Sequence, residues 1–169
     1  MKGSSDLFAV NSCAQVLQEL GHGACILQCD SENAVVDLSR AVAAKYRGEV
    51  TLRQTPIGSK GSNGTVERFH QSVQAMARTL VASIEFYYGG RRIEANDNIV
   101  AWAIRHAAWL YTRFQVHESG TTGYEAVMKR KYDSEVMEFG STLSGRSDHR
   151  SRPKALPDWT EGIWVGRSS

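Results

Sequence analysis

The 169-residue chain is 41% apolar and 22% charged, a composition ordinary for one globular domain with a core of its own. No apolar run reaches the roughly 18–20 residues that span a bilayer, and the first residues lack the pattern of a signal peptide. We therefore expect no membrane partner and an intracellular location, in cytoplasm or nucleus, while the net charge of +2 leaves nucleic-acid contact to local patches.

The first half of the chain alternates helical and extended patterns. Apolar residues recur at the helical period over 5–20, and Gly21 ends this segment. The run ACILQC (24–29) predicts a strand buried on both faces, residues 32–46 predict a second helix, and EVTLRQT (49–55) predicts an edge-type strand. This order of elements predicts an α/β fold in which the two strands are parallel.

The second half is mainly helical and ends in a segment of different character. PIGSKGSNG (56–64) predicts a loop, after which helices are expected at about 65–87, 97–116 and 122–130. Strand-like segments at 136–143 and 162–166 flank a polar stretch, which we interpret as a flexible connection within a small β appendage. The expected domains are therefore residues 1–130 and residues 131–169.

Basic residues gather in and beside the polar stretch of the appendage. This arrangement is typical either of a segment that follows a nucleic-acid backbone or of a charged linker, and the linker is the favoured interpretation. The residues are Arg146, Arg150, Arg152 and Lys154.

The three cysteines, Cys13, Cys25 and Cys29, contain no C-x-x-C pair. If Cys25 and Cys29 share one strand they point to the same face, but they lie too far apart to bind one metal ion. We interpret all three as buried free thiols in a reducing compartment.

Two carboxylates stand at positions where a site can form. Asp30 ends the first predicted strand, and Glu67 opens the helix that follows the glycine-rich loop. The segment between them supplies a helix, a returning parallel strand and the loop, a path that can bring both to the carboxyl edge of the sheet. Paired carboxylates there can hold Mg²⁺ or Mn²⁺ for phosphoryl transfer. Alternatively, Asp30 caps the next helix and Glu67 simply favours a helix N-terminus.

Five segments carry a family pattern. In the first segment, ELGHGACILQCDSENAV (19–35), an acidic residue directly follows a predicted strand. The second segment, SKGSNGTVERFHQSVQAMARTL (59–80), contains the signature Ser-x-Gly-x-x-Glu as SNGTVE. AWAIRHAAWLYTRFQVHESGTTGYEAV (101–127), with FGSTL and EGIWVGR beyond it, completes a pattern that covers about residues 5–167. Together these segments resemble the integrase catalytic core encoded in copia-like retrotransposon polyproteins.

The resemblance implies a ribonuclease-H-like fold and a metal-dependent polynucleotidyl transferase that processes and joins DNA ends. It assigns Asp30 and Glu67 as the second and third acids of an Asp-Asp-Glu triad, with Mg²⁺ or Mn²⁺ as cofactor. In the family, the first aspartate lies on the opening strand of a three-stranded meander, which the residues before Asp30 cannot supply. Asp6, at a predicted helix start, is not expected to replace it. We therefore expect an incomplete, N-terminally truncated core that is inactive as an isolated chain.

The helix after the loop has a polar face suited to DNA. By the resemblance, Gln71 and Gln74 lie near the scissile phosphate; Arg78 shares their face with Glu67, and Lys60 in the loop can reach a phosphate. A merely solvated polar face is the alternative. The opposite stripe is apolar and comprises Val66, Val73, Ala77, Leu80 and Ile84.

Two further expectations concern partners. Without the meander, the strand 24–29 has an edge that is bare, filled by another copy or partner, or filled by the C-terminal strands. DNA is the expected ligand of the intact site. The alternative function is a non-catalytic nucleic-acid-binding or assembly module derived from a retroelement.

Overall fold

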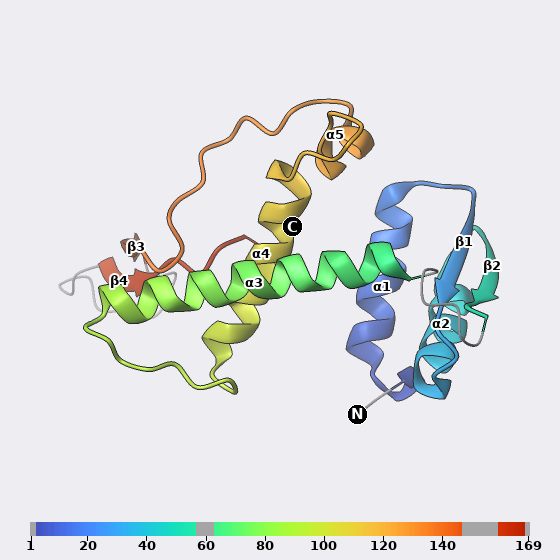
Figure 1. Cartoon of the computed structure of the whole chain (residues 1–169), viewed down its shortest axis with the longest axis horizontal. Helices are drawn as coiled ribbons and strands as arrows, with labels where there is room; N and C mark the ends of the chain where they lie inside the picture. The colour runs from blue at the N-terminus through green and yellow to red at the C-terminus, as the bar shows by residue number, and fades with distance from the viewer. Residues whose placement is uncertain (1–2, 57–62, 147–158, 168–169) are drawn as a thin grey trace. The chain divides into compact units, whose positions relative to one another are not determined.

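The computed structural model describes residues 3–56, 63–146 and 159–167 (Figure 1). The chain divides into two compact units, Met1–Arg68 and Phe69–Ser169, and each has an apolar core of its own. None of the helices in the described ranges combines the length and apolarity needed to cross a membrane.

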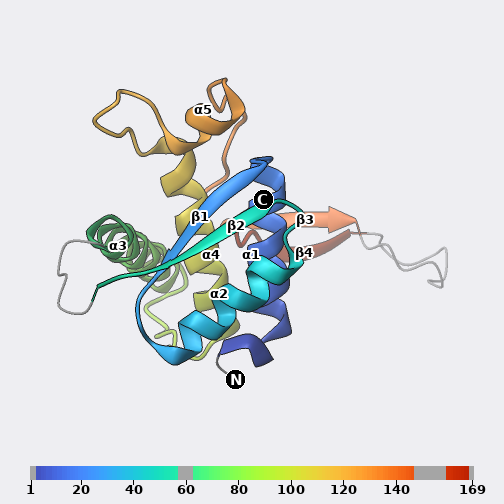
Figure 2. The ribbon, with the colours of Figure 1, turned by 90° about the vertical axis from the view of Figure 1, so that its right-hand side faces the viewer.

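The first unit is a parallel pair of strands with helices against it (Figure 2). The strands pair in register from Ala24 opposite Glu49 to Cys29 opposite Gln54. The predicted α/β class and the parallel arrangement of the two strands are thereby confirmed. Its elements are η1 (Gly3–Ser5), α1 (Leu7–Leu20), β1 (Ala24–Cys29), α2 (Asn33–Lys45) and β2 (Glu49–Gln54).

Local capping and apolar packing explain this unit. The Asp6 carboxylate accepts a hydrogen bond from the Ala9 amide at 3.0 Å and so caps the start of α1. The helix ends at Gly21, whose φ of 70° is the left-handed conformation that glycine adopts without strain. Val10 of α1 and Val42 of α2 are each 2% exposed and form a core against which Leu27 of β1 packs.

Among the described residues only one face of β1 is covered, so the prediction of a strand buried on both faces is wrong. Cys29 is buried and Leu27 half-buried, whereas Ile26, which points the other way, is 60% exposed. The reason is that α1 and α2 bury the alternate residues that include Leu27. The cysteine prediction is correspondingly corrected: Cys29 is buried, Cys25 is half-buried and Cys13 is exposed, and all three are free thiols.

The second unit is built on two long helices. Helix α3 begins within the first unit and continues into the second, where its apolar stripe packs against α4. Val66 departs from the predicted stripe, being 54% exposed, because the cluster on which the stripe packs involves α3 only from Phe69 onward. The elements are α3 (Gly64–Tyr87), α4 (Asn98–Phe114), α5 (Gly123–Met128), β3 (Thr142–Arg146) and β4 (Trp159–Ile163). The core residues are Val73, Ala77, Ile84, Ala103, Ala107 and Phe139.

The C-terminal strands begin elsewhere than the sequence indicates. β3 and β4 form an antiparallel pair, but β3 starts only at Thr142 and β4 ends at Ile163. Phe139, at 3% exposed, is drawn into the core of α3 and α4, and Gly140 turns the chain with a φ of 91°. The segment expected as an appendage thus contributes to this core, while the boundary predicted at residue 130 stays a prediction.

His106 of α4 anchors the chain end described after β4. His106 is 2% exposed, its imidazole forms stacked contacts with Trp109 and Phe139, and its Nδ1 accepts a hydrogen bond from the Arg167 amide at 3.2 Å. Gly166 makes this approach possible, since a Cβ there would lie 2.4 Å from Cγ of His106. Burial lowers the pKa of His106 below its usual value.

Candidate functional site at the carboxyl edge of the parallel strands

Asp30 and Glu67 both belong to the first unit. Asp30 directly follows Cys29, the last residue of β1, and both carboxylates are on exposed residues. Glu67 lies in the first turn of α3, where its amide donates to the Asn63 carbonyl at 2.9 Å. The position of Asn63 therefore determines where Glu67 stands relative to the strand ends.

Asn63 is tied to the ends of both strands. Its side-chain Oδ1 accepts a hydrogen bond from Gln28 Nε2 of β1 at 3.3 Å and lies 3.2 Å from the Thr55 hydroxyl just after β2. Thr55 in turn bonds to Cys29, its amide donating to the Cys29 carbonyl at 2.8 Å. The hydroxyl lies 3.0 Å from the same carbonyl, and its single proton serves one of its two acceptors at a time. The start of α3 is consequently held at the carboxyl ends of β1 and β2.

Arg53 extends this network on the neighbouring strand. Its Nε donates to Gln28 Oε1 at 2.9 Å, which orients the Gln28 amide so that its nitrogen faces Asn63. Arg53 is exposed and lines, with Gln28, Gln54 and Pro56, a hollow of about 420 Å³. A basic group capable of contacting phosphate therefore stands at the same edge of the sheet as Asp30.

Asp30 has a local structural role as well. One carboxylate oxygen, Oδ1, accepts a hydrogen bond from the Glu32 amide at 3.1 Å, immediately before α2. This contact closes a local turn and does not cap α2, because the N-cap residue is Glu32 and no side chain caps the helix; the interpretation of Asp30 as a cap is therefore wrong. Within the described ranges, neither the other Asp30 oxygen nor the Glu67 carboxylate forms a hydrogen bond or ion pair with protein. Three carboxylate oxygens are thus available to a ligand.

The carboxylates of Asp30 and Glu67 are the right kind of ligand for a hard divalent cation, but they are few. Carboxylate oxygens are the ligands that Mg²⁺ and Mn²⁺ prefer, and a full site needs several of them or bound water. In the part of the chain that the structure describes, no group of three or more His, Cys, Asp or Glu is placed to share a metal ion. Asp6 is already used as the cap of α1. No catalytic step is therefore derived through a metal for these two residues alone.

The predicted DNA-contacting residues of α3 lie in the second unit. Gln71, Gln74 and Arg78 are all exposed. Gln74 and Arg78 border a groove of about 430 Å³ whose other walls include Val81 and Ile104. Arg78 forms no ion pair with another described residue, so its charge is available to an anionic partner.

Several of the predicted basic contacts fall outside the described residues. Lys60 lies in the segment 57–62, and Arg150, Arg152 and Lys154 lie in the segment 147–158. Arg146 is described, at the end of β3.

Sequence reasoning missed the residues that hold the start of α3 at the ends of the two strands. Asn63 occupies a variable position of the Ser-x-Gly-x-x-Glu signature, and Gln28 lies within the apolar run that predicts the first strand. A polar side chain within an otherwise apolar strand, two residues before the acid, was the available signal. Arg53 and Thr55 carry no comparable signal, because their role depends on pairing with β1.

Comparisons with protein-family models, with curated proteins and with solved structures find no match. The functional assignment therefore rests on the residues of this chain and their arrangement.

Proposed function

We propose that the chain is part of a retroviral-type integrase core with a ribonuclease-H-like fold. In this proposal Asp30 and Glu67 hold Mg²⁺ or Mn²⁺ for DNA end processing and strand transfer. The partner is DNA, and the protein acts inside the cell. The observation that supports it is the pair of hydrogen-bond contacts of Asn63 with Gln28 and Thr55. These contacts hold the start of α3, the helix that carries Glu67, at the carboxyl ends of the parallel strands, which is where α/β proteins place their sites.

The isolated chain is proposed to be a poor catalyst. Two carboxylates leave a pair of metal ions short of protein oxygens, so a metal binds weakly and mainly through water. A metal that is not firmly positioned contributes little charge stabilisation to phosphoryl transfer. DNA binding through Gln71, Gln74, Arg78 and Lys60 does not require that metal.

Manganese binding tests the assignment of the two acids. We expect Mn²⁺ to broaden the NMR signals of residues 28–32 and 63–68 first. Asp30→Asn or Glu67→Gln should each weaken binding about tenfold or more, and Asn63→Ala should weaken it by a similar factor by misplacing Glu67. Glu49→Gln is the matched control, because it removes an exposed carboxylate at the opposite edge of the same sheet.

The DNA arm of the test uses fluorescence anisotropy with a short duplex at several salt concentrations. Arg78→Ala should weaken binding and lower the salt slope by about one, whereas Arg47→Ala, at the amino edge of the sheet, should change neither. A different result would support the alternative function, a non-catalytic nucleic-acid-binding module. In that case the chain binds DNA, and neither Asp30→Asn nor Glu67→Gln changes its affinity for Mn²⁺.

An oligonucleotide joining assay completes the test. We expect no Mg²⁺- or Mn²⁺-dependent joining by the purified chain. Joining that Asp30→Asn and Glu67→Gln both abolish would refute the inactivity of the isolated chain. It would mean that Asp6, Glu32 or a second subunit completes the site.

A further inference from the structure

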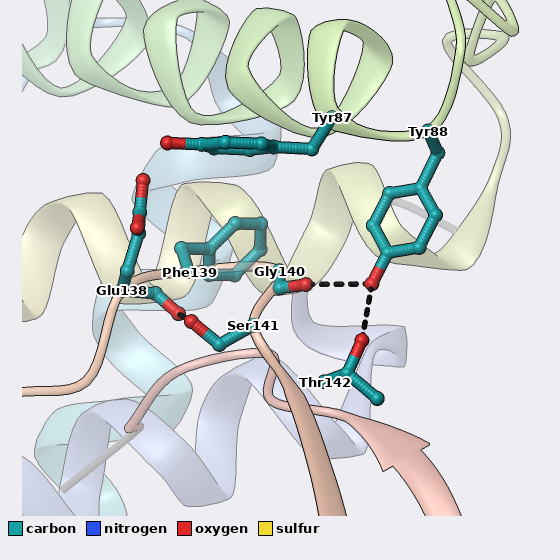
Figure 3. Close-up of a pocket in the computed structure, with 7 residues that line it drawn as sticks. All are labelled: Tyr87, Tyr88, Glu138, Phe139, Gly140, Ser141 and Thr142. Carbon is teal, nitrogen blue, oxygen red and sulfur yellow. Dashed lines mark hydrogen bonds between the residues drawn. The ribbon is translucent and has the colours of Figure 1, made fainter.

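A second hollow, of about 330 Å³, lies in the second unit where the end of α3 meets the segment leading into β3 (Figure 3). It contains two adjacent phenol rings, one carboxylate and two hydroxyl groups. We name it the Tyr87–Glu138 pocket. Its lining residues are Tyr87, Tyr88, Glu138, Phe139, Gly140, Ser141 and Thr142.

The hydroxyl protons of this pocket are committed to the protein. The Tyr88 hydroxyl donates to the Gly140 carbonyl at 2.9 Å, because a carbonyl can only accept. The Thr142 hydroxyl, 3.1 Å from the Tyr88 oxygen, must then be the donor in that second contact. The Ser141 hydroxyl donates to the Glu138 carbonyl at 2.7 Å. These three side chains therefore offer only lone pairs to a ligand.

The carboxylate of Glu138 also offers a ligand only hydrogen-bond acceptors. The Tyr87 hydroxyl points toward the Glu138 carboxylate (Figure 3). Hydrogen bonding to that carboxylate, and then its negative charge, raise the pKa of Tyr87 above its usual value. Glu138 forms no ion pair with any described residue. A negative charge thus stands beside aromatic rings, and no cation of the described residues forms an ion pair with it.

The pocket wall is preformed. Phe139 is 3% exposed and anchors the segment in the core, while the Gly140 amide donates to the Trp164 carbonyl at 2.8 Å. Gly140 is required at this point, since a Cβ would lie 2.6 Å from Cγ1 of Ile84 and its φ is 91°. The acceptors are therefore held by the fold, and a ligand need not organise them.

We propose that the Tyr87–Glu138 pocket binds an organic cation that carries N–H donors, an ammonium or a guanidinium group. Such a group donates to the Glu138 carboxylate and to the hydroxyl lone pairs, and the phenol rings attract its positive charge. An anion finds no free donor among the lining side chains. A divalent metal ion finds one carboxylate, too few for a stable site.

NMR titration of the full chain tests the assignment with methylguanidinium, methylammonium, tetramethylammonium and sodium chloride. We expect saturable shifts at residues 87–88 and 138–142 with the first two cations. Tetramethylammonium, which lacks N–H donors, should bind several-fold more weakly, and sodium should produce no saturable shift. Shifts that follow ionic strength alone, or equal binding of all three organic cations, would overturn the proposal.

Matched variants localise the effect. Glu138→Gln should weaken methylguanidinium binding at least tenfold, whereas Glu135→Gln removes an exposed carboxylate from the same segment and should leave it unchanged. Tyr87→Phe keeps the ring and should retain most of the binding, and Tyr87→Leu should weaken it. Unchanged binding by a folded Glu138→Gln protein would refute the assignment.

A last arm distinguishes a free amine from a side chain of a partner protein. A short peptide with one arginine between neutral residues is titrated beside methylguanidinium. Tighter, Glu138-dependent binding of the peptide would support a protein partner, and equal affinity would support a free cation. If Glu138→Gln changes the affinity of neither the peptide nor methylguanidinium, both forms of the proposal are overturned.

Discussion

His106 illustrates what a single buried titratable residue does in this protein. Its neutral Nδ1 accepts the Arg167 amide at 3.2 Å, and its ring lies among Trp109, Phe139 and Trp164. Protonation would place a second positive charge near Arg167 and remove the acceptor. Burial, the largest cause, lowers the pKa of His106, and the charge of Arg167 lowers it further.

This lowered pKa predicts acid sensitivity of folding. Above a pH of about 6.5 His106 is neutral in both states and has no pH-dependent effect. As the pH falls through about 6.5, the unfolded chain binds a proton that the folded chain resists, so the free energy of unfolding decreases. Urea unfolding between pH 7.5 and 5 should show this loss, and His106→Asn, which keeps an acceptor but does not titrate, should show a flatter dependence. Equal slopes for the two proteins would exclude His106 as the cause.

At the scale of elements, the two pairs of strands have different surroundings. β1 pairs with β2, and β3 and β4 form a separate pair. Of the three outcomes foreseen for the remaining edge of β1, filling by the C-terminal strands is wrong. Among the described residues nothing pairs with that edge, and Ile26 beside it is 60% exposed. An apolar strand with an unpaired edge favours addition of another strand.

We therefore expect the chain to self-associate through β1. Ile26→Lys should decrease concentration-dependent association in sedimentation velocity experiments, because a charged residue opposes strand addition. Thr51→Lys is the matched control. Thr51 lies opposite Ile26 in register, so this substitution adds the same charge on β2 instead of β1. An equal decrease in both variants would mean that net charge or the outer edge of β2, rather than the β1 edge, controls association.

At the scale of the whole molecule, the described residues form two apolar cores. The first contains Val10, Ala14 and Val42, and the second is centred on Ala103, Ala107 and Phe139. Because each unit encloses its own core, a cavity in one is expected to weaken mainly the elements of that unit.

Val42→Ala should lower the free energy of local unfolding in residues 1–68 by about 2 kcal/mol, the loss of two buried methyl groups with a small cavity term. Ile84→Val should lower the free energy of local unfolding in residues 69–169 by about 1 kcal/mol. Hydrogen–deuterium exchange with mass spectrometry measures both. If either substitution weakens protection equally along the whole chain, the two units unfold as one cooperative structure.

The sequence by itself determined the elements and their order. The strand at 24–29, the end of α1 at Gly21 and the helix beginning near Glu67 all follow from patterns within a few residues. Capping, glycine conformation and apolar periodicity act locally, so they can be recognised without knowing what packs against them. The positions of Asp30 and Glu67 after a strand and at a helix start belong to the same class of information.

The tertiary structure decided what these elements face. Ile26 is exposed because the helices bury the alternate residues of β1, and β3 begins late because Phe139 is drawn into the core of α3 and α4. Likewise, Gln28, Thr55 and Asn63 meet only when β1, β2 and the start of α3 have assembled. Burial and hydrogen bonding between residues distant in sequence depend on the partner that packing brings, and no local pattern records that partner.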